Sequence, residues 1–143
     1  MFKIITCSIL LLWHLQIFLY AEEYFLTLRN DKVNLRQGPS FEYPIKLFYK
    51  KKFLPVIVQD QFENFRKIRD HENNTGWIHI SQLSKKKAAI TVDNNKLIFN
   101  KPSIYSKPNA ILHKGRLCNI KKCKGSWCKV SVGNFKGWVQ KEN

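Results

Sequence analysis

The stretch VNLRQGPSFEYP, from Val33 to Pro44, decides how the fold of this chain is interpreted. Its first four residues alternate apolar and polar side chains like a short strand, and the Gly38-Pro39 pair that follows is typical of a turn. Gly38 can adopt backbone angles closed to other residues, and Pro39 fixes the next φ angle. The stretch contains no nucleophile signature, metal-ligand cluster or phosphate loop. It is therefore first a fold element, a turn that closes a small β structure, and second a candidate binding wall.

Strand signals continue along the chain, and helix signals are almost absent. Short runs of β-branched or aromatic residues occur at LPVIVQD (54–60), FRKIRD (65–70) and TGWIHI (75–80). Asn, Asp, Gly and Pro bound these runs, as they commonly bound strands. Short strands at this spacing predict a small all-β barrel or sandwich.

The second half of the chain repeats the first. The matching pairs are Phe65 and Trp127, Ile68 and Val130 (each 62 residues apart), Trp77 and Trp138 (61 apart), and Pro39 and Pro102 (63 apart). A repeat at a nearly constant separation is the mark of a duplicated structural unit. We expect two units, at 22–86 and 87–143, joined near Lys85–Ala88, that pack together because such small barrels are marginally stable alone.

The N-terminal stretch MFKIITCSILLLWHLQIFLYA (1–21) has the layout of a secretory signal peptide. Lys3 is its only charged residue, an apolar run follows to Tyr20, and Ala21 precedes Glu22 and Glu23. The sequence therefore predicts export to the periplasm or outside the cell. The alternative is a retained membrane anchor, since the apolar run approaches the length that spans a bilayer. Contact with a membrane is expected only through an uncleaved signal peptide.

The chain is strongly basic, with a formal net charge of +15, of which +14 lies after residue 21. Such a balance favours association with a polyanion such as a cell-wall polymer, lipid headgroups or nucleic acid. A solvated basic surface is the alternative interpretation. The densest lysine clusters, at 50–52 and 85–87, are too short for a disordered basic arm. We do not expect a nucleic-acid partner for an exported chain, although small basic barrels with aromatic side chains can bind single strands.

The turn, the LPVIV and FRKIRD runs and the TGWIH segment together resemble the bacterial SH3 domain family, in its exported tandem form. The resemblance covers essentially the whole chain after the signal peptide. The first copy carries the full Asn-x-Arg-x-Gly-Pro-Ser turn, whereas the second, LIFNKPSIYSKP, lacks the Arg and the Gly and is degenerate. The resemblance implies two tandem SH3-like β-barrels, the second one degenerate, after an N-terminal signal peptide.

In SH3 domains an aromatic shelf between two loops holds an extended peptide, and aromatic side chains cluster here where that shelf would lie. For Phe65 and Trp77 the other interpretation is barrel packing, because small barrels bury their large side chains; Ile68 is expected in the core. Phe41 and Tyr43 lie on the turn and are the better ligand candidates. Lysines 50–52 would attract carboxylates. The ligand-binding candidates are Arg36, Phe41, Tyr43, Lys51, Phe65 and Trp77.

The segment CNIKKCKGSWCKV (118–130) contains three cysteines spaced by five, and His113 lies five residues before the first. Zinc is one interpretation, but five-residue steps along strands point side chains to opposite faces, and an exported compartment favours oxidation. A tight Gly125-Ser126 turn would place Cys123 opposite Cys128, whereas a longer loop would allow Cys118 to take part. The family resemblance favours the Cys123–Cys128 disulfide. Cys118 would then be a buried thiol, or else a reactive or intermolecular one.

No catalytic residue, cofactor or metal site is predicted. His71 and His79 have no Ser or Cys nucleophile in a signature beside them, and Glu63 and Asp70 are the only interior carboxylates that could pair for hydrolysis. The sequence favours a non-catalytic exported protein of the cell envelope, whose SH3-like groove recognises peptidoglycan or an envelope protein or peptide. The alternative is a structural or interaction protein whose barrels pack on each other and dock a protein or an anionic surface.

Overall fold

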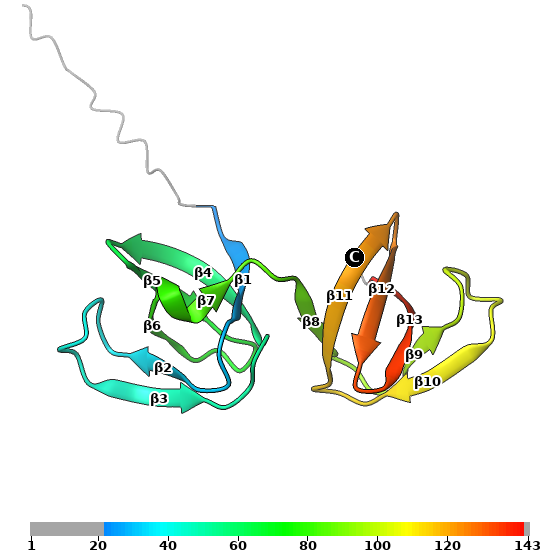
Figure 1. Ribbon diagram of the computed structural model, residues 1–143, viewed down its shortest axis with the longest axis horizontal. Coiled ribbons are helices and arrows are strands. Elements are labelled where there is room, and N and C mark those ends of the chain that lie inside the picture. Colours follow the sequence, from blue (N-terminus) through cyan, green and yellow to red (C-terminus); the bar gives the residue numbers. More distant parts are fainter. Residues whose placement is uncertain (1–21, 142–143) are drawn as a thin grey trace, which may run out of the picture.

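The computed structural model describes residues 22–141, in which strands are separated by turns and one short 3₁₀ helix (Figure 1). The expected signal peptide (1–21) lies outside the described residues. Within the described part of the chain, no helix is long and apolar enough to cross a membrane. The protein is all-β, as the sequence predicts.

The first unit is one bent sheet in which seven strands follow the order β3-β2-β6-β5-β4-β1-β7. Neighbouring strands are antiparallel, and no ladder joins the two edge strands β3 and β7 among the described residues, so the sheet curls around its core without closing. The 3₁₀ helix η1 leads from β6 into β7. The elements are β1 (Tyr24–Leu28), β2 (Val33–Arg36), β3 (Ile45–Tyr49), β4 (Pro55–Phe62), β5 (Phe65–Arg69), β6 (Thr75–His79), η1 (Ile80–Gln82) and β7 (Leu83–Ser84).

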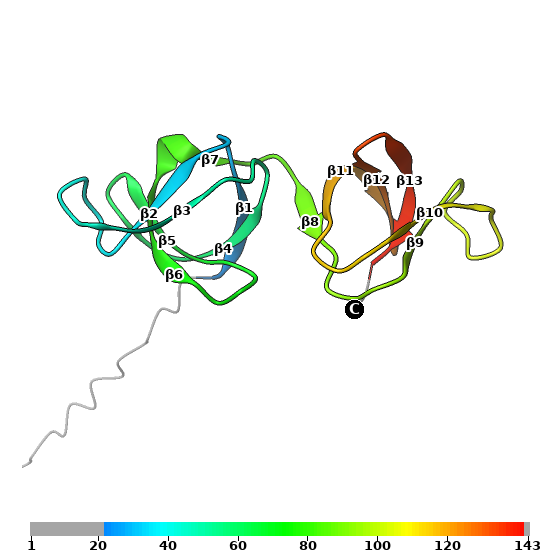
Figure 2. The ribbon, with the colours of Figure 1, turned by 90° about the horizontal axis from the view of Figure 1, so that it is seen from below.

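The second unit is a six-stranded antiparallel sheet in the order β10-β9-β13-β12-β11-β8. The two units lie side by side, and β8 lies at the face of the second unit that is turned toward the first (Figures 1 and 2). The strands are β8 (Ala88–Ile90), β9 (Lys96–Phe99), β10 (Pro108–Leu112), β11 (Leu117–Lys124), β12 (Trp127–Val132) and β13 (Phe135–Gln140).

The register of the strands repeats the sequence spacing. In the first unit Phe62 pairs with Phe65 and Lys67 pairs with Trp77. In the second unit Lys124 pairs with Trp127, and Lys129 pairs with Trp138. Phe65 thus occupies the place of Trp127, and Trp77 that of Trp138, which confirms the repeat. The separation falls from 62 to 61 residues because the loop between β12 and β13 of the second unit is shorter than the loop between β5 and β6 of the first.

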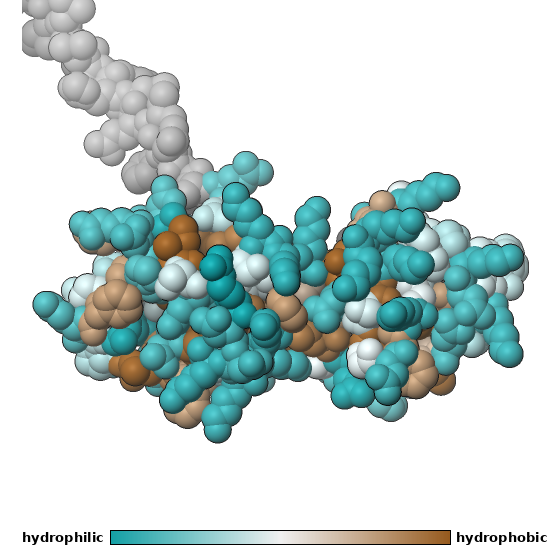
Figure 3. Space-filling view, viewed as in Figure 1, coloured by the Kyte–Doolittle hydropathy of each residue, from teal (hydrophilic) through white to brown (hydrophobic). Residues whose placement is uncertain are grey.

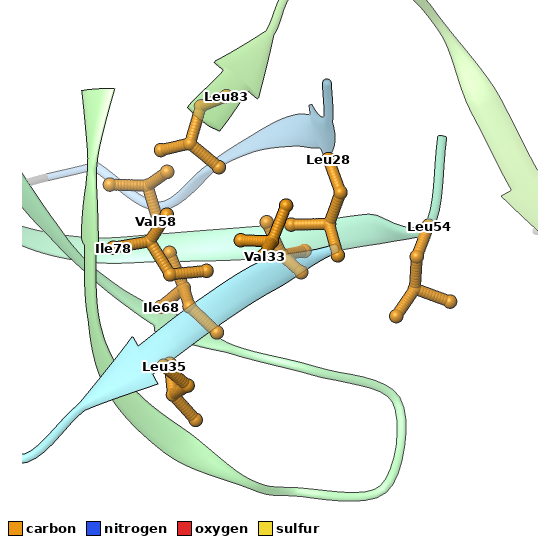
Figure 4. Close-up of a cluster of buried hydrophobic side chains, with 9 residues drawn as sticks. Leu28, Val33, Leu35, Leu54, Val58, Ile68, Ile78 and Leu83 are labelled. Atoms are coloured by element: carbon orange, nitrogen blue, oxygen red, sulfur yellow. The ribbon is translucent and has the colours of Figure 1, made fainter. Parts of the chain in front are cut away.

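The core of the first unit forms on the inward face of its alternating strands. Val33 and Leu35 of β2 are fully buried, while Asn34 between them and Arg36 after them are only partly buried. Ile68 is also fully buried, as predicted. Figure 4 shows these aliphatic side chains converging between the strands. The buried members are Leu28, Val33, Leu35, Leu54, Val56, Val58, Ile68, Ile78 and Leu83.

A buried carboxylate fixes the loop between β5 and β6. Asp70 is 4% exposed and accepts hydrogen bonds from the backbone nitrogens of Glu72 (2.9 Å) and Asn74 (2.8 Å). The Asn74 side chain (2.8 Å) and the Tyr49 hydroxyl (2.9 Å) donate to its other oxygen. Burial alone would raise the pKa of Asp70, but these hydrogen bonds outweigh it and hold the pKa below its ordinary value. Burial, followed by the bond to Asp70, raises the pKa of Tyr49.

We predict that Asp70→Asn lowers the free energy of unfolding of the first unit by about 1 to 3 kcal/mol at neutral pH, because an amide cannot accept all four bonds. Since the pKa of Asp70 is lowered by folding, its contribution is complete above the ordinary carboxyl pKa and is lost as the pH falls through the folded-state pKa. Urea unfolding from neutral to acid pH should therefore show the variant and the wild type converging at low pH. A pH-independent difference would contradict this account.

Candidate functional site

Arg36, the last residue of β2, ties down the turn that follows it. Its Nη1 donates to the carbonyl oxygens of Phe41 (3.1 Å) and Tyr43 (2.9 Å). The backbone nitrogen of Gln37 donates to the carbonyl oxygen of Pro44 (3.1 Å), which closes the turn at its base. The guanidinium also lies 5.4 Å from the centroid of the Phe41 ring. Arg36 therefore sets the position of Phe41 as well as the path of the backbone.

Gly38 is needed in this turn for a reason other than the one expected from sequence. Its φ is not in the left-handed region, where three other glycines of the described chain lie. A Cβ at Gly38 would instead stand 2.5 Å from ring carbons of Tyr43. The Tyr43 ring thus packs on the backbone of Gly38, although Tyr43 is still 48% exposed. The expectation of special backbone angles at Gly38 was wrong, and close approach of the ring is the cause.

Three rings meet beside this turn, and we call Phe41, Phe65 and His79, with Arg36, the aromatic cluster. The ring centroids lie 5.2 Å (Phe41–Phe65), 5.0 Å (Phe41–His79) and 5.1 Å (Phe65–His79) apart. Phe65 is 6% exposed and Phe41 is 62% exposed. The buried ring therefore supports an exposed one, whose edge-to-face contact fixes its orientation. This geometry presents a supported apolar ring to solvent.

The strand pairing explains how the cluster forms. Phe65 pairs with His79 across β5 and β6, so the two side chains lie on the same face of the sheet. Trp77, two residues before His79, is on that face as well, and it pairs with Arg36 of β2. Sequence reasoning treated His79 as a surface residue and missed it. The signal was present in the alternation of Trp77 and His79 along one predicted strand.

Lys51 is not grouped with these residues. Its Nζ donates to the carbonyl oxygen of Gly115 in the second unit (3.2 Å), so it bridges the two units. Of the six predicted ligand-binding residues, the structure brings together Arg36, Phe41 and Phe65. Trp77 lies on the same face of the sheet, and Tyr43 lies on the adjoining turn. Lys51 lies apart from them, at the junction of the two units.

The second unit keeps the turn but changes the surface. Asn100 donates to the carbonyl oxygen of Lys107, as Gln37 does to that of Pro44. The backbone nitrogen of Tyr105 donates to Ser103 Oγ, as that of Glu42 does to Ser40 Oγ. Phe99 stands in the place of Arg36, and its ring contacts Trp127 edge to face at 5.6 Å. The second unit therefore also carries an aromatic pair here, without the guanidinium.

The sequence profile of the bacterial SH3 domain matches residues 29–85 and again residues 92–143. The chain belongs to the bacterial SH3 domain family. Its two bacterial SH3 domains correspond to the two sheets described above. None of the curated proteins matches the chain.

Two solved structures are similar to the chain over 85% of its length, both at 12% sequence identity. They are the NlpC1 and NlpC2 structures from Trichomonas vaginalis, with TM-scores of 0.39 and 0.38. The chain spans less than half of each, 45% and 47% respectively.

The second SH3 domain contains the disulfide between Cys123 and Cys128. Lys124 pairs with Trp127, so Gly125 and Ser126 form a two-residue turn, and the two cysteines lie directly opposite each other. Gly125 has a φ of 57°, which suits such a turn. The hairpin that the sequence offered as one alternative is therefore present, and Cys118 takes no part in the bridge.

A β-bulge in β11 changes the face of the strand on which Cys123 lies, contrary to the expectation from the five-residue spacing of the cysteines. The register of β11 against β12 shifts between Ile120 and Lys122, which leaves Lys121 as an extra residue. The bulge returns Cys123 to the face that carries Cys118, although a regular strand would point them apart. Among residues 22–141, no three His, Cys, Asp or Glu side chains lie close enough together to hold a metal ion.

Cys118 is a buried free thiol, 3% exposed. Burial raises its pKa, and the nearby Arg116 charge lowers it by less. Because the thiolate is the reactive form, we predict that iodoacetamide modifies Cys118 at least about tenfold more slowly than a denatured-state thiol at neutral pH. Site-resolved mass spectrometry in native buffer and in denaturant measures this ratio. Equal rates in the two conditions would contradict the prediction.

Proposed function

We propose that this protein is a non-catalytic binding protein of the cell envelope, and that the aromatic cluster of the first SH3 domain holds an extended peptide or a peptidoglycan stem. One observation carries the proposal: Phe41 is exposed yet held from two sides, by Phe65 beneath it and by Arg36 beside it. Rigid, exposed aromatic side chains bind with little loss of conformational entropy. Such residues dominate recognition surfaces.

Polar groups around the aromatic cluster could orient a bound ligand through hydrogen bonds. Arg36 has guanidinium nitrogens besides Nη1, which is used by the turn. His79 contributes a second ring nitrogen, since Nδ1 contacts Ser81 Oγ at 2.7 Å. A peptide carboxylate or carbonyl group could be recognised by these donors while an apolar side chain contacts Phe41.

Export to the envelope fits this function. The disulfide suits an oxidising compartment, and membership of the bacterial SH3 domain family fits a role at the cell wall. We propose that residues 1–21 direct the chain there and are removed.

A second candidate function is that of a structural or interaction protein, which the junction between the domains favours. Lys51 bonds to Gly115, and Ile90 of β8 packs against the core of the first domain. The aromatic cluster takes no part in these contacts, so the two domains do not pack through it. Lysine side chains gather at this junction and would attract an anionic surface; hydrophilic side chains cover most of the face seen in Figure 3.

Co-sedimentation with purified peptidoglycan sacculi at low and moderate salt separates the two functions. An apolar cluster should keep the protein in the pellet when salt is raised, whereas attraction by lysines is screened. Pelleting that disappears at moderate salt would leave only the charge-driven function. Absence of pelleting at both salt concentrations would reject peptidoglycan as the partner, and release of soluble wall fragments would show an enzyme.

A further inference from the structure

The second SH3 domain contains an apolar cavity of about 370 Å³. Its floor is formed by buried side chains of the domain core, Leu112, Cys118, Cys128 and Val130. It reaches the surface at Val92, which is 59% exposed, and at the exposed Asp93 and Lys141. Cavities of this volume with mostly apolar walls are typical of small-molecule sites.

The first domain shows why the cavity exists. Ala89 corresponds to Leu26, because Ala89 pairs with Cys118 and Leu26 pairs with Val56. Thr91 corresponds to Leu28 in the same way. The backbone nitrogen of Thr91 donates to the carbonyl oxygen of Arg116, and that of Leu28 donates to the carbonyl oxygen of Leu54. The first domain thus has leucines where the second has Ala89 and Thr91. Each replacement removes aliphatic volume from the same side of the core.

The first domain fills this part of its core with a third aliphatic side chain. In the first domain Leu83 of β7 pairs with Leu28 and is 2% exposed. The second domain follows the same backbone course as far as Lys141, which corresponds to Ile80. The backbone nitrogen of Lys141 donates to the carbonyl oxygen of Ser126, and that of Ile80 donates to the carbonyl oxygen of Asn64. The positions that would correspond to β7 follow Lys141 and lie outside the described residues. The lost aliphatic volume that the structure describes is therefore that at Ala89 and Thr91.

The surroundings of the cavity decide what kind of molecule fits. β8 is an edge strand of the second sheet and lies between the two domains (Figures 1 and 2). Its Ile90 packs against the core of the first domain, and its Ala89 lines the cavity. Charged residues of both signs line the cavity, namely Asp93, Lys96 and Lys141, so charge of one sign does not define the site. Most of the wall is aliphatic carbon and cysteine sulfur, and sulfur is soft and polarizable. The selective feature is thus the apolar interior.

We propose that this cavity is a binding site for the single aliphatic chain of a small amphiphile, whose polar head remains at the rim beside Val92. The volume is roughly twelve times the share of one water molecule in the liquid, enough for a chain of about ten carbons. An apolar cavity stays dry and accepts apolar ligands, since filling it restores lost contacts. The site is independent of the aromatic cluster in the first domain.

Cys118 reports occupancy because its thiol lines the cavity. The full chain is treated with methyl methanethiolsulfonate, a small neutral thiol reagent, with and without decanoate below its micelle concentration. Site-resolved mass spectrometry follows Cys118 alone. We expect decanoate to slow the modification at least about threefold, which corresponds to occupancy of two thirds of the sites or more. An unchanged rate, or a faster one accompanied by a lower melting temperature, would overturn the proposal.

A pair of variants on one strand tests the location. Ala89→Leu restores the leucine of the first domain and fills part of the cavity, so protection by decanoate should fall to less than half. Ala88→Leu makes the same change one residue earlier, at a position that does not line the cavity, and should keep the protection. Equal protection in both variants would place the ligand elsewhere and overturn the proposal.

A second amphiphile identifies the source of the bound aliphatic chain, and a peptide tests the other class of occupant. Protection by decylphosphocholine as well as decanoate supports a lipid source, and protection by decanoate alone supports a free fatty acid. A peptide with the sequence of His79–Ser84 tests the other class of occupant. Protection by that peptide without protection by decanoate would overturn the proposal in favour of a protein segment.

Discussion

Gly76→Ala is expected to destabilise the first SH3 domain by about 3 kcal/mol, because the strand beside it leaves no space for a methyl group. A Cβ at Gly76 would stand 2.7 Å from the carbonyl oxygen of Arg36 and 2.7 Å from Leu35 Cγ. The obstacle includes backbone, which cannot rotate away as a side chain can. Urea unfolding, with hydrogen exchange resolved for each domain, measures the loss and assigns it to the first domain.

The second domain provides a twin and a control for this prediction. At Gly137 the added Cβ would meet Ile98 Cγ2 and the carbonyl oxygen of Phe99, each at 2.5 Å, so Gly137→Ala should be similarly costly. Gly133 has a positive φ of 55° and no atom within 4 Å of the added Cβ. Gly133→Ala should therefore cost only about 1 kcal/mol, from backbone strain alone. Equal effects for all three variants would refute the close-approach explanation.

Phe41→Ala is expected to weaken binding to peptidoglycan or its peptide about tenfold or more, while the domain stays folded. Phe41 is the exposed ring of the aromatic cluster, and removal of a well-supported aromatic contact commonly costs over 1 kcal/mol of binding free energy. The change also removes its contact with Arg36 but leaves the two hydrogen bonds that Arg36 makes to backbone carbonyls. Affinity at moderate salt measures the effect without the lysine contribution.

Phe48→Ala is the matched control for this variant. Phe48 is 48% exposed in the same domain, and its ring contacts Lys32 and Lys50 rather than the cluster. We expect its affinity to remain within about twofold of the wild type, as for a surface change outside a binding site. Equal losses for the two variants would mean that general apolar exposure, not the cluster, drives binding.

The sequence predicted most of the fold because its signals were local and repeated. The all-β class follows from alternating runs bounded by turn residues, and the repeat from Phe65, Trp77 and their partners at nearly constant separation. The two-residue turn at Gly125 was also visible, since turn type depends on a few neighbouring residues. These features need no knowledge of distant contacts.

Features that depend on contacts across strands were harder to predict. The bulge at Lys121 changes which face Cys123 occupies, and no residue type marks it in the sequence. The need for glycine at position 38 arises from the Tyr43 ring, five residues later. The placement of Lys51 depends on how the two domains pack. Each of these requires the register or the docking of whole elements, which side-chain periodicity does not specify.

The most direct test of the proposed binding site is an NMR titration of isotope-labelled protein with soluble peptidoglycan stem fragments at moderate salt. The account predicts that the largest shift changes occur at Arg36, Phe41, Phe65 and His79, with smaller changes at Phe99 and Trp127 of the second domain. Shift changes confined to the lysine-rich junction near Lys51 and Lys86, or none at all, would contradict it.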